Sequence, residues 1–160
     1  MSEVKQGRWM AEIDGDFVVF IIGARPTKGR LRHAFADLGG RRGMLHMLKV
    51  LTEHPEKGLL GYQMSTFGGL IVQYWRSFED LERFANDDQD PHLAAWRNYW
   101  RRVGRGTGTG IWHETFLVRA GEYEAIYANM PPQGLGKAAR LVPAAEFATA
   151  RGRLRHRAAS

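Results

Sequence analysis

The sequence contains no cysteine among its 160 residues. This absence excludes disulfide scaffolds, zinc–thiolate sites, iron–sulfur clusters and thiol nucleophiles, and it agrees with the reducing cytoplasm in which we expect the protein. Long apolar runs are also missing, since the longest, Phe17 to Ile22, falls far short of the roughly 20 residues that a membrane-spanning helix needs. The opening residues MSEVKQGRWM have no apolar segment, so we expect no secretory signal.

Positive charge is concentrated at the end of the chain. Lysine and arginine number 23 against 17 acidic residues, which gives a net charge of +6. Residues 151–160 hold four arginines and no acidic residue, so they carry +4 and residues 1–150 carry +2. A basic tail can bind nucleic acid, but termini of this kind are more often solvated and frayed. We therefore expect a flexible tail over 146–160 and no nucleic-acid partner.

Apolar patterning predicts one α+β domain over residues 15–145, preceded by a lead-in segment over 1–14. Helices are expected at Arg42–His54, after the capping residue Ser77, and from Pro91 onward. Strands are expected at Phe17–Gly23, Leu59–Thr66, Leu70–Arg76 and Ile111–Val118, with an extra C-terminal strand at Tyr123–Asn129. This order is that of a ferredoxin-like split βαβ sheet, in which the helices lie on one face.

The predicted strands are apolar on both faces, although the helices can cover only one. FVVFIIG at Phe17–Gly23 and LIVQYWR at Leu70–Arg76 are the clearest cases. Strands of this kind are buried on both sides. A second copy of the sheet is the simplest cover, so we expect a homodimer in which two sheets enclose a barrel-like interior.

Common catalytic and phosphate-binding motifs are missing. GRGTGTG, residues 104–110, lacks the following Lys-Ser/Thr and leads into a strand, whereas a phosphate loop leads into a helix. We interpret it as a connector. HExxH, GxSxG and acidic metal-loop motifs do not occur, and we expect no metal site.

The segment IWHETFLV–RAGE–YEAIYANMP is the strongest candidate for chemistry. If Ala120 and Gly121 form a hairpin turn, Glu114 lies opposite Tyr127, and His113 faces the other side. A carboxylate among aromatic rings has a raised pKa and could act as a base. A structural hydrogen bond or ion pair of Glu114 is the alternative. The face of the hairpin that carries Glu114 and Tyr127 would also carry Trp112, Phe116, Tyr123 and Asn129.

Two histidines have open assignments. His113 could bond a backbone carbonyl in the core, or it could ligate a metal or haem iron. His92 and Trp96 are spaced i, i+4 and share one helix face. They either pack on the sheet or line the mouth of a pocket, while Tyr74 is expected in the pocket wall.

The combination of GLLGYQM, QYWRSFEDLE and GIWHETF…YEAIYANMP resembles a known family. It is similar to the fumagillin-pathway monooxygenase-like domain, within the dimeric α+β barrel superfamily, over about residues 7–145. This superfamily includes antibiotic-biosynthesis monooxygenases, haem-degrading monooxygenases, chlorite dismutases and aldoxime dehydratases. The resemblance implies a homodimer with a pocket between sheet and helices, and oxygenase chemistry. Motif positions matched here are His92, Trp96, Trp112, His113, Glu114, Tyr123, Glu124, Tyr127 and Asn129.

The hypothesis that follows is a small monooxygenase-like oxidoreductase of secondary metabolism. It would oxygenate an apolar or aromatic molecule without a cofactor. We predict catalytic roles for Glu114, Tyr127, Asn129 and His113, and substrate-binding roles for Trp112, Trp96, His92, Tyr123 and Tyr74. A haem enzyme of the same fold, with His113 or His92 as axial ligand, is the first alternative. A non-enzymatic dimer that binds an apolar ligand is the second.

Overall fold

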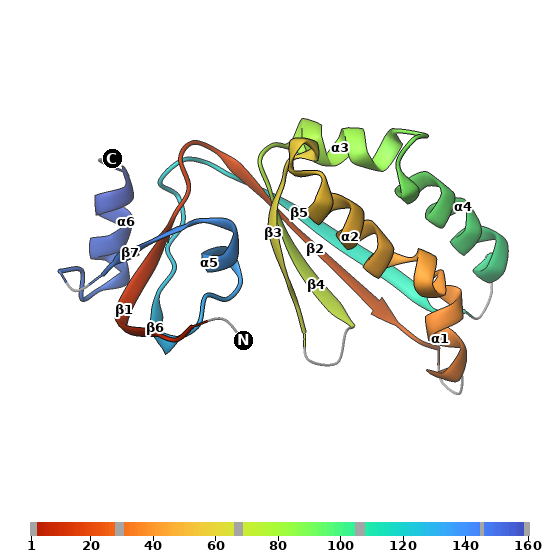
Figure 1. Ribbon diagram of the computed structural model, residues 1–160, viewed down its shortest axis with the longest axis horizontal. Coiled ribbons are helices and arrows are strands. Elements are labelled where there is room, and N and C mark those ends of the chain that lie inside the picture. The colour runs from red at the N-terminus through yellow and green to blue at the C-terminus, as the bar shows by residue number, and fades with distance from the viewer. Residues whose placement is uncertain (1–2, 28–30, 66–68, 105–107, 145, 159–160) are drawn as a thin grey trace.

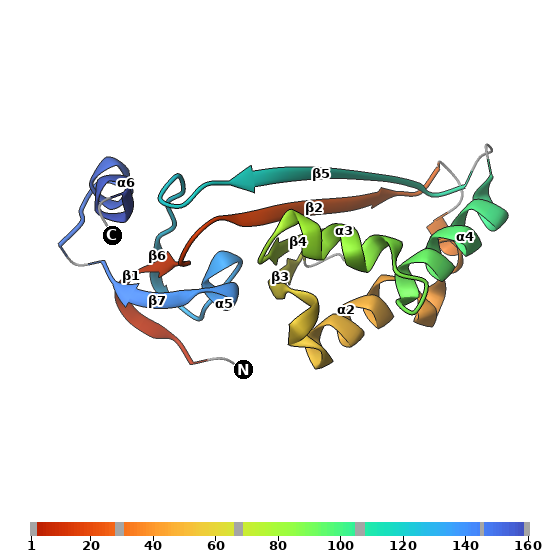
Figure 2. The ribbon, with the colours of Figure 1, turned by 90° about the horizontal axis from the view of Figure 1, so that it is seen from above.

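The computed structural model describes residues 3–27, 31–65, 69–104, 108–144 and 146–158. It contains two antiparallel sheets at opposite ends of an elongated molecule (Figures 1 and 2). The large sheet has the strand order β3-β4-β2-β5, and the small sheet has the order β6-β1-β7. None of the helices in the described ranges has the length and apolarity that crossing a bilayer requires.

The large sheet agrees with the prediction from the sequence. Its central strand β2 pairs with β4 on one side and with β5 on the other. The strands are β2 (Phe17–Arg25), β3 (Leu59–Met64), β4 (Leu70–Trp75) and β5 (Gly110–Val118). Thr66 and residues 105–107 of the predicted connector lie outside the described residues.

Three long helices lie on one face of this sheet, as Figure 2 shows: α2 (Met44–Glu53), α3 (Phe78–Asn86) and α4 (Pro91–Val103). In α2 the buried side chains Met47, Leu48 and Leu51 form an apolar stripe with helical spacing. The short α1 (Leu31–Asp37) and the 3-10 turns Gly40–Arg42 and Pro55–Lys57 complete this layer. Together with β2 to β5, these helices form the predicted α+β arrangement with helices on one sheet face.

Local capping explains where α3 begins. The Ser77 hydroxyl accepts a hydrogen bond from the Asp80 backbone N–H at 3.1 Å, as an N-cap does. The Asp80 carboxylate pairs with Arg76 and Arg83 instead of returning to Ser77. Asp90 precedes α4, and its carboxylate lies 2.7 Å from Lys57 Nζ, so it ties the start of α4 to the 3-10 turn that follows α2.

The small sheet corrects two predictions. Residues 1–14 are not a simple lead-in, because β1 (Lys5–Glu12) is the central strand of this sheet. The predicted hairpin of β5 with Tyr123–Asn129 is also wrong: β6 (Tyr127–Met130) pairs with β1, and Tyr127 lies opposite Trp9. The remaining elements are β7 (Arg140–Pro143), which pairs with β1, and α5 (Leu135–Ala138).

The predicted flexible tail is wrong as well. Residues Ala150–Ala158 form helix α6, beside the small sheet in Figure 1. Arg153 is 7% exposed, and its guanidinium binds the Glu124 carboxylate and the Phe147 carbonyl. His156 stacks on the Phe147 ring with centroids 4.5 Å apart. A buried, paired arginine holds this segment to the body of the protein, and composition alone gave no sign of that.

The two sheets share an apolar core. Ala11, Phe17, Tyr127 and Leu135 are its buried centre, and Val19, Leu60 and Tyr74 of the large sheet pack against it. The large sheet has a second face, opposite helices α2, α3 and α4, which is called the helix-free face below because none of these three helices covers it. Part of that face is covered by the small sheet and the short α5. The remainder of that face carries Ile21, Val72, Trp112, Glu114 and Phe116, and none of the described helices lies over it.

Candidate functional site

A cavity of about 460 Å³ lies between the large sheet and helices α2, α3 and α4. This volume falls within the range of about 300–1,000 Å³ typical of small-molecule sites. The walls are mainly apolar, and the sheet supplies the floor while the helices supply the roof. Representative wall residues are Phe20, Ile71, Trp75, Met44, Met47 and Phe84.

Alternation along each strand decides which side chains reach this cavity. In β5, Ile111, His113 and Thr115 line it, so the odd-numbered residues face the helices. Trp112 and Glu114 consequently point to the opposite face. A few polar groups interrupt the apolar walls, among them the side chains of His92, His113, Gln73, Tyr99 and Thr115.

His92 is held in a defined tautomer. Its Nδ1 lies 2.8 Å from the Ala85 carbonyl oxygen. A carbonyl only accepts hydrogen bonds, so Nδ1 carries the proton, and in the neutral ring Nε2 then holds the lone pair. The Phe84 ring lies 6.3 Å from the imidazole, centroid to centroid. His92 can therefore accept a proton or ligate an iron at Nε2.

His113 lies on the cavity floor beside Phe20, with ring centroids 5.3 Å apart. It is opposite Ile22 of β2 in the register of the sheet, and its side chain retains solvent exposure because β5 is an edge strand. The cavity thus has one imidazole in its roof, His92, and one at its edge, His113.

Gln73 is the most buried of the polar side chains in the cavity, with 4% exposure. The Trp75 indole N–H donates to Gln73 Oε1 at 2.9 Å. Gln73 Nε2 lies 3.9 Å from Met44 Sδ. The hydrogen bond from Trp75 therefore orients the Gln73 amide.

Tyr99 closes one end of the cavity. Its hydroxyl donates to the Thr109 carbonyl at 2.8 Å, which ties α4 to the start of β5. Burial raises the pKa of Tyr99, and the negative charge of Asp37 raises it further. Tyr99 therefore stays protonated as a donor. Trp96 stacks on Tyr99 with centroids 5.4 Å apart and is 40% exposed, as suits a residue at the cavity mouth.

The structure brings three of the predicted site residues together in this cavity: His92, Trp96 and His113. It does not bring Glu114 there. Glu114 is exposed, lies opposite Ile21 in β2, and belongs to the helix-free face. Trp112 is on the same face and 45% exposed, with its indole against Gly23, where a Cβ would approach the ring to 2.5 Å.

The predicted tyrosines Tyr74, Tyr123 and Tyr127 belong to the apolar core that the two sheets share, and Asn129 is exposed on β6. The Tyr127 hydroxyl accepts from the Gly136 N–H at 2.7 Å, and the Tyr123 hydroxyl accepts from the Ile13 N–H at 2.6 Å. Burial raises the pKa values of Tyr127 and Tyr74. Asn129 has a φ of 51° and accepts from the Gly7 N–H at 2.8 Å. Through these contacts Tyr127, Tyr123 and Asn129 hold together the small sheet, α5 and the segment that follows β1.

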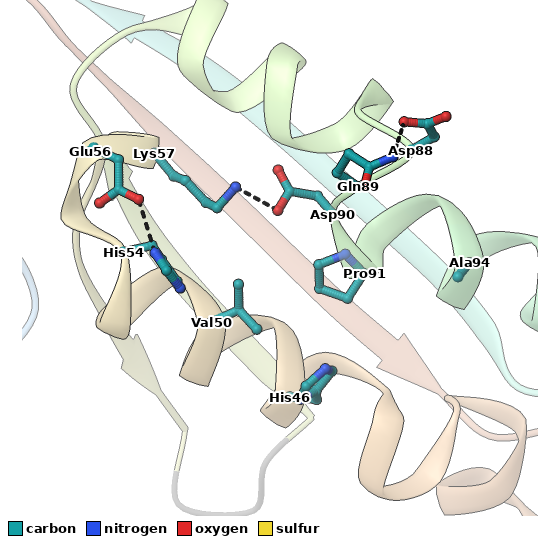
Figure 3. Close-up of a pocket in the computed structure, with 10 residues that line it drawn as sticks. All are labelled: His46, Val50, His54, Glu56, Lys57, Asp88, Gln89, Asp90, Pro91 and Ala94. Carbon is teal, nitrogen blue, oxygen red and sulfur yellow. Dashed lines mark hydrogen bonds and ion pairs between the residues drawn. The ribbon is translucent and has the colours of Figure 1, made fainter.

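A second, polar pocket opens on the surface between α2 and the start of α4 (Figure 3). His54 Nδ1 lies 2.9 Å from Glu56, and Lys57 pairs with Asp90. Three carboxylates, those of Glu56, Asp88 and Asp90, line this pocket with one ammonium group, that of Lys57, and the walls offer little apolar surface. The apolar cavity is the better candidate site. In the described ranges, no group of three or more His, Asp or Glu side chains is placed to hold a metal ion.

Sequence reasoning missed Gln73 and Tyr99. Gln73 had a usable signal: it is the one polar residue in LIVQYWR on the same parity as Ile71 and Trp75. A lone polar residue on a buried strand face needs a specific partner. Tyr99 had a weaker signal, because the aromatic residues of α4 fit a packing stripe equally well.

The part of the chain that builds this cavity is also the part that matches a known family. A family described as monooxygenase af470-like matches residues 17–135. The chain belongs to this family. A curated member, "Monooxygenase af470" of Aspergillus fumigatus, is 32% identical over 95 residues. That match covers 55% of this chain and 33% of the relative, so the chain spans only a part of that protein's length.

Solved structures of other proteins have the same fold as this chain. An aldoxime dehydratase crystallised with butyraldoxime superposes with a TM-score of 0.59 at 17% identity, covering 88% of this chain and 44% of that one. A second aldoxime dehydratase gives 0.56 at 19% identity, with 97% and 45% covered. At these identities the likeness shows the fold alone, which this chain shares with the matched part of the two dehydratases.

Proposed function

We propose that this chain is a small-molecule enzyme of the monooxygenase type whose substrate binds in the apolar cavity between the helices and the large sheet. The observation that carries the proposal is the cavity itself, with His92 presenting a lone pair at Nε2 among apolar walls. Family membership supports oxygenation as the reaction class.

His92, and not Glu114, takes the role of base in this proposal. Proton removal by a positioned side chain requires a lone pair within reach of the substrate. Glu114 lies on the other sheet face, whereas His92 lines the cavity. Trp96 and Phe84 would hold an aromatic substrate beside the imidazole.

The proposed reaction proceeds without a cofactor. His92 removes a proton from an acidic methylene group of the substrate, and the resulting carbanion gives its electrons to dioxygen. A carbon–oxygen bond forms to give a peroxide, which loses water and leaves a ketone. Dioxygen is reduced to the ketone oxygen and one molecule of water by the electrons of the oxidised methylene group, so the reaction needs no further reductant.

Dioxygen uptake with a panel of aromatic ketones that carry acidic C–H groups tests this proposal. We expect a ketone product whose new oxygen comes from isotopically labelled dioxygen. His92→Gln should lower the rate by about 10²-fold or more, the usual contribution of a general base. His46→Gln is the control, since His46 is exposed on the outer side of α2. Saturable binding of a compound, with no dioxygen uptake in the presence of any compound of the panel, would favour the non-enzymatic alternative.

A haem enzyme of the same fold is the alternative, and one feature favours it. An imidazole whose second nitrogen is hydrogen-bonded to a carbonyl is a common metal ligand, and His92 has this arrangement in an apolar cavity. His92 or His113 would ligate the iron, which when bound would supply redox and Lewis-acid chemistry. A saturable Soret shift on haem titration, lost in His92→Ala or His113→Ala, would establish this alternative.

We further propose that two copies associate through the helix-free sheet face. Trp112 and Phe116 are 45% and 49% exposed on it, and Ile21 and Val72 lie on the same face. Large apolar side chains gathered on one face are typical of an interface. This arrangement is the homodimer expected from the sequence.

A further inference from the structure

We propose that Gln73 selects the ligand of the cavity by donating a hydrogen bond to it, so that the ligand is an apolar aromatic ketone. This inference rests on the proposed function, because it assumes that a small molecule occupies the cavity. It assigns a specificity-determining role to Gln73 and names the chemical class that the cavity accepts.

The orientation of the Gln73 amide follows from its contact with Trp75. An indole N–H can only donate a hydrogen bond, so the atom that lies 2.9 Å from Trp75 Nε1 must be the amide oxygen. Both N–H groups are therefore on the opposite side of the amide. The strand fixes this arrangement, because Gln73 and Trp75 are two residues apart in β4 and face the same side.

The amide nitrogen lacks a strong acceptor. Among the described residues, its nearest partner is Met44 Sδ at 3.9 Å, and a thioether is a weak acceptor. The side chain is 4% exposed and lines the cavity. A buried N–H without an acceptor is costly, and a ligand carbonyl in the cavity would satisfy it.

A carbonyl at this position would also assist the proposed proton transfer. When His92 removes a proton from the carbon next to the carbonyl, the electron pair moves onto the carbonyl oxygen to give an enolate. A fixed N–H donor stabilises the charge that develops there. Gln73 and His92 line the same cavity from the floor and the roof, so one substrate can contact both.

The experiment uses two probes of nearly equal shape, α-tetralone and its hydrocarbon counterpart tetralin. Binding is followed by tryptophan fluorescence, since Trp75 and Trp96 line the cavity. In Gln73→Met, which keeps the length of the side chain, the preference for tetralone over tetralin should fall about tenfold relative to wild type, as expected for one lost hydrogen bond. The affinity for tetralin should be almost unchanged.

A matched control and a second readout complete the test. Gln63→Met removes an amide from β3, opposite Val72 and on the helix-free face, and should leave the preference as in wild type. In the wild-type protein, the infrared stretching frequency of the carbonyl group of bound tetralone should lie below its value in a hydrocarbon solvent. This measurement does not depend on a variant that folds. An unshifted stretch, or an unchanged preference in Gln73→Met, would overturn the inference while leaving the cavity as a binding site. Failure of both probes to bind would overturn the inference and the proposed function together.

Discussion

Replacement of Arg153 by methionine should destabilise the protein substantially, although Arg153 lies in a basic C-terminal segment. Arg153 Nε donates to Glu124 Oε1 at 2.7 Å, Nη2 donates to the same oxygen, and Nη1 donates to the Phe147 carbonyl at 2.9 Å. Methionine keeps much of the apolar stem and removes all three donors. Glu124 then loses its cationic partner.

The magnitude follows from burial of the pair. The exposed fractions of the two side chains are 8% for Arg153 and 22% for Glu124. Breaking a fully buried ion pair costs about 3–5 kcal/mol, and the remaining solvent contact of Glu124 reduces this to about 2–3 kcal/mol. For a chain of this length, each kcal/mol lowers the melting temperature by about 2–4 °C. The expected decrease is therefore roughly 4–12 °C.

Thermal unfolding followed by circular dichroism measures this decrease. Arg155→Met is the matched control, because Arg155 is exposed on the same helix and its loss should change the melting temperature very little. Deletion of residues 150–160 should destabilise the protein at least as much as Arg153→Met. Equal melting temperatures for Arg153→Met, Arg155→Met and wild type would refute the docking of α6.

Three further predictions concern pH, assembly and colour. Burial alone would raise the pKa of Asp80, but its hydrogen bonds and ion pairs with Arg76 and Arg83 hold the pKa below the ordinary value. The stability that Asp80 contributes is therefore present above a pH of about 3.9 and is lost as the pH falls below that value. The difference in unfolding free energy between wild type and Asp80→Asn should consequently become smaller in acid. Light scattering of the wild-type protein should report a mass of about twice 18.1 kDa. The double variant Trp112→Glu and Phe116→Glu should give the mass of the monomer. A monomeric wild type would contradict the proposed interface. The purified protein should be colourless, and a Soret band after growth with haem would favour the haem alternative.

The large sheet and its helices could be predicted because their signals are local. Strands apolar on both parities, a helical stripe at Met47, Leu48 and Leu51, and the Ser77 cap each lie within a few consecutive residues. The small sheet depends on distant pairings instead. Trp9 of β1 lies opposite Tyr127 on one side and Pro143 on the other. Proximity along the chain favoured a hairpin of β5 with the next segment, and that assumption produced the incorrect Glu114–Tyr127 register.

Only part of the candidate site could be predicted, because the rest also depends on contacts between distant residues. Alternation correctly placed His113 and Glu114 on opposite faces of β5. It could not indicate which face the helices cover, because that depends on how α2 to α4 pack on the sheet. The role of His92 required the position of the Ala85 carbonyl, and the role of Gln73 required its contact with Trp75. Both are tertiary contacts that no spacing rule encodes.

The most direct test of the central claim compares His92→Gln with Glu114→Gln. The two residues lie on opposite faces of the large sheet, so the comparison asks which face carries the chemistry. The measurement is dioxygen uptake with the first aromatic ketone that the wild-type protein oxidises. The cavity account predicts a loss of about 10²-fold or more in His92→Gln and nearly full activity in Glu114→Gln. Full activity in His92→Gln together with a large loss in Glu114→Gln would contradict it and move the active site to the helix-free face.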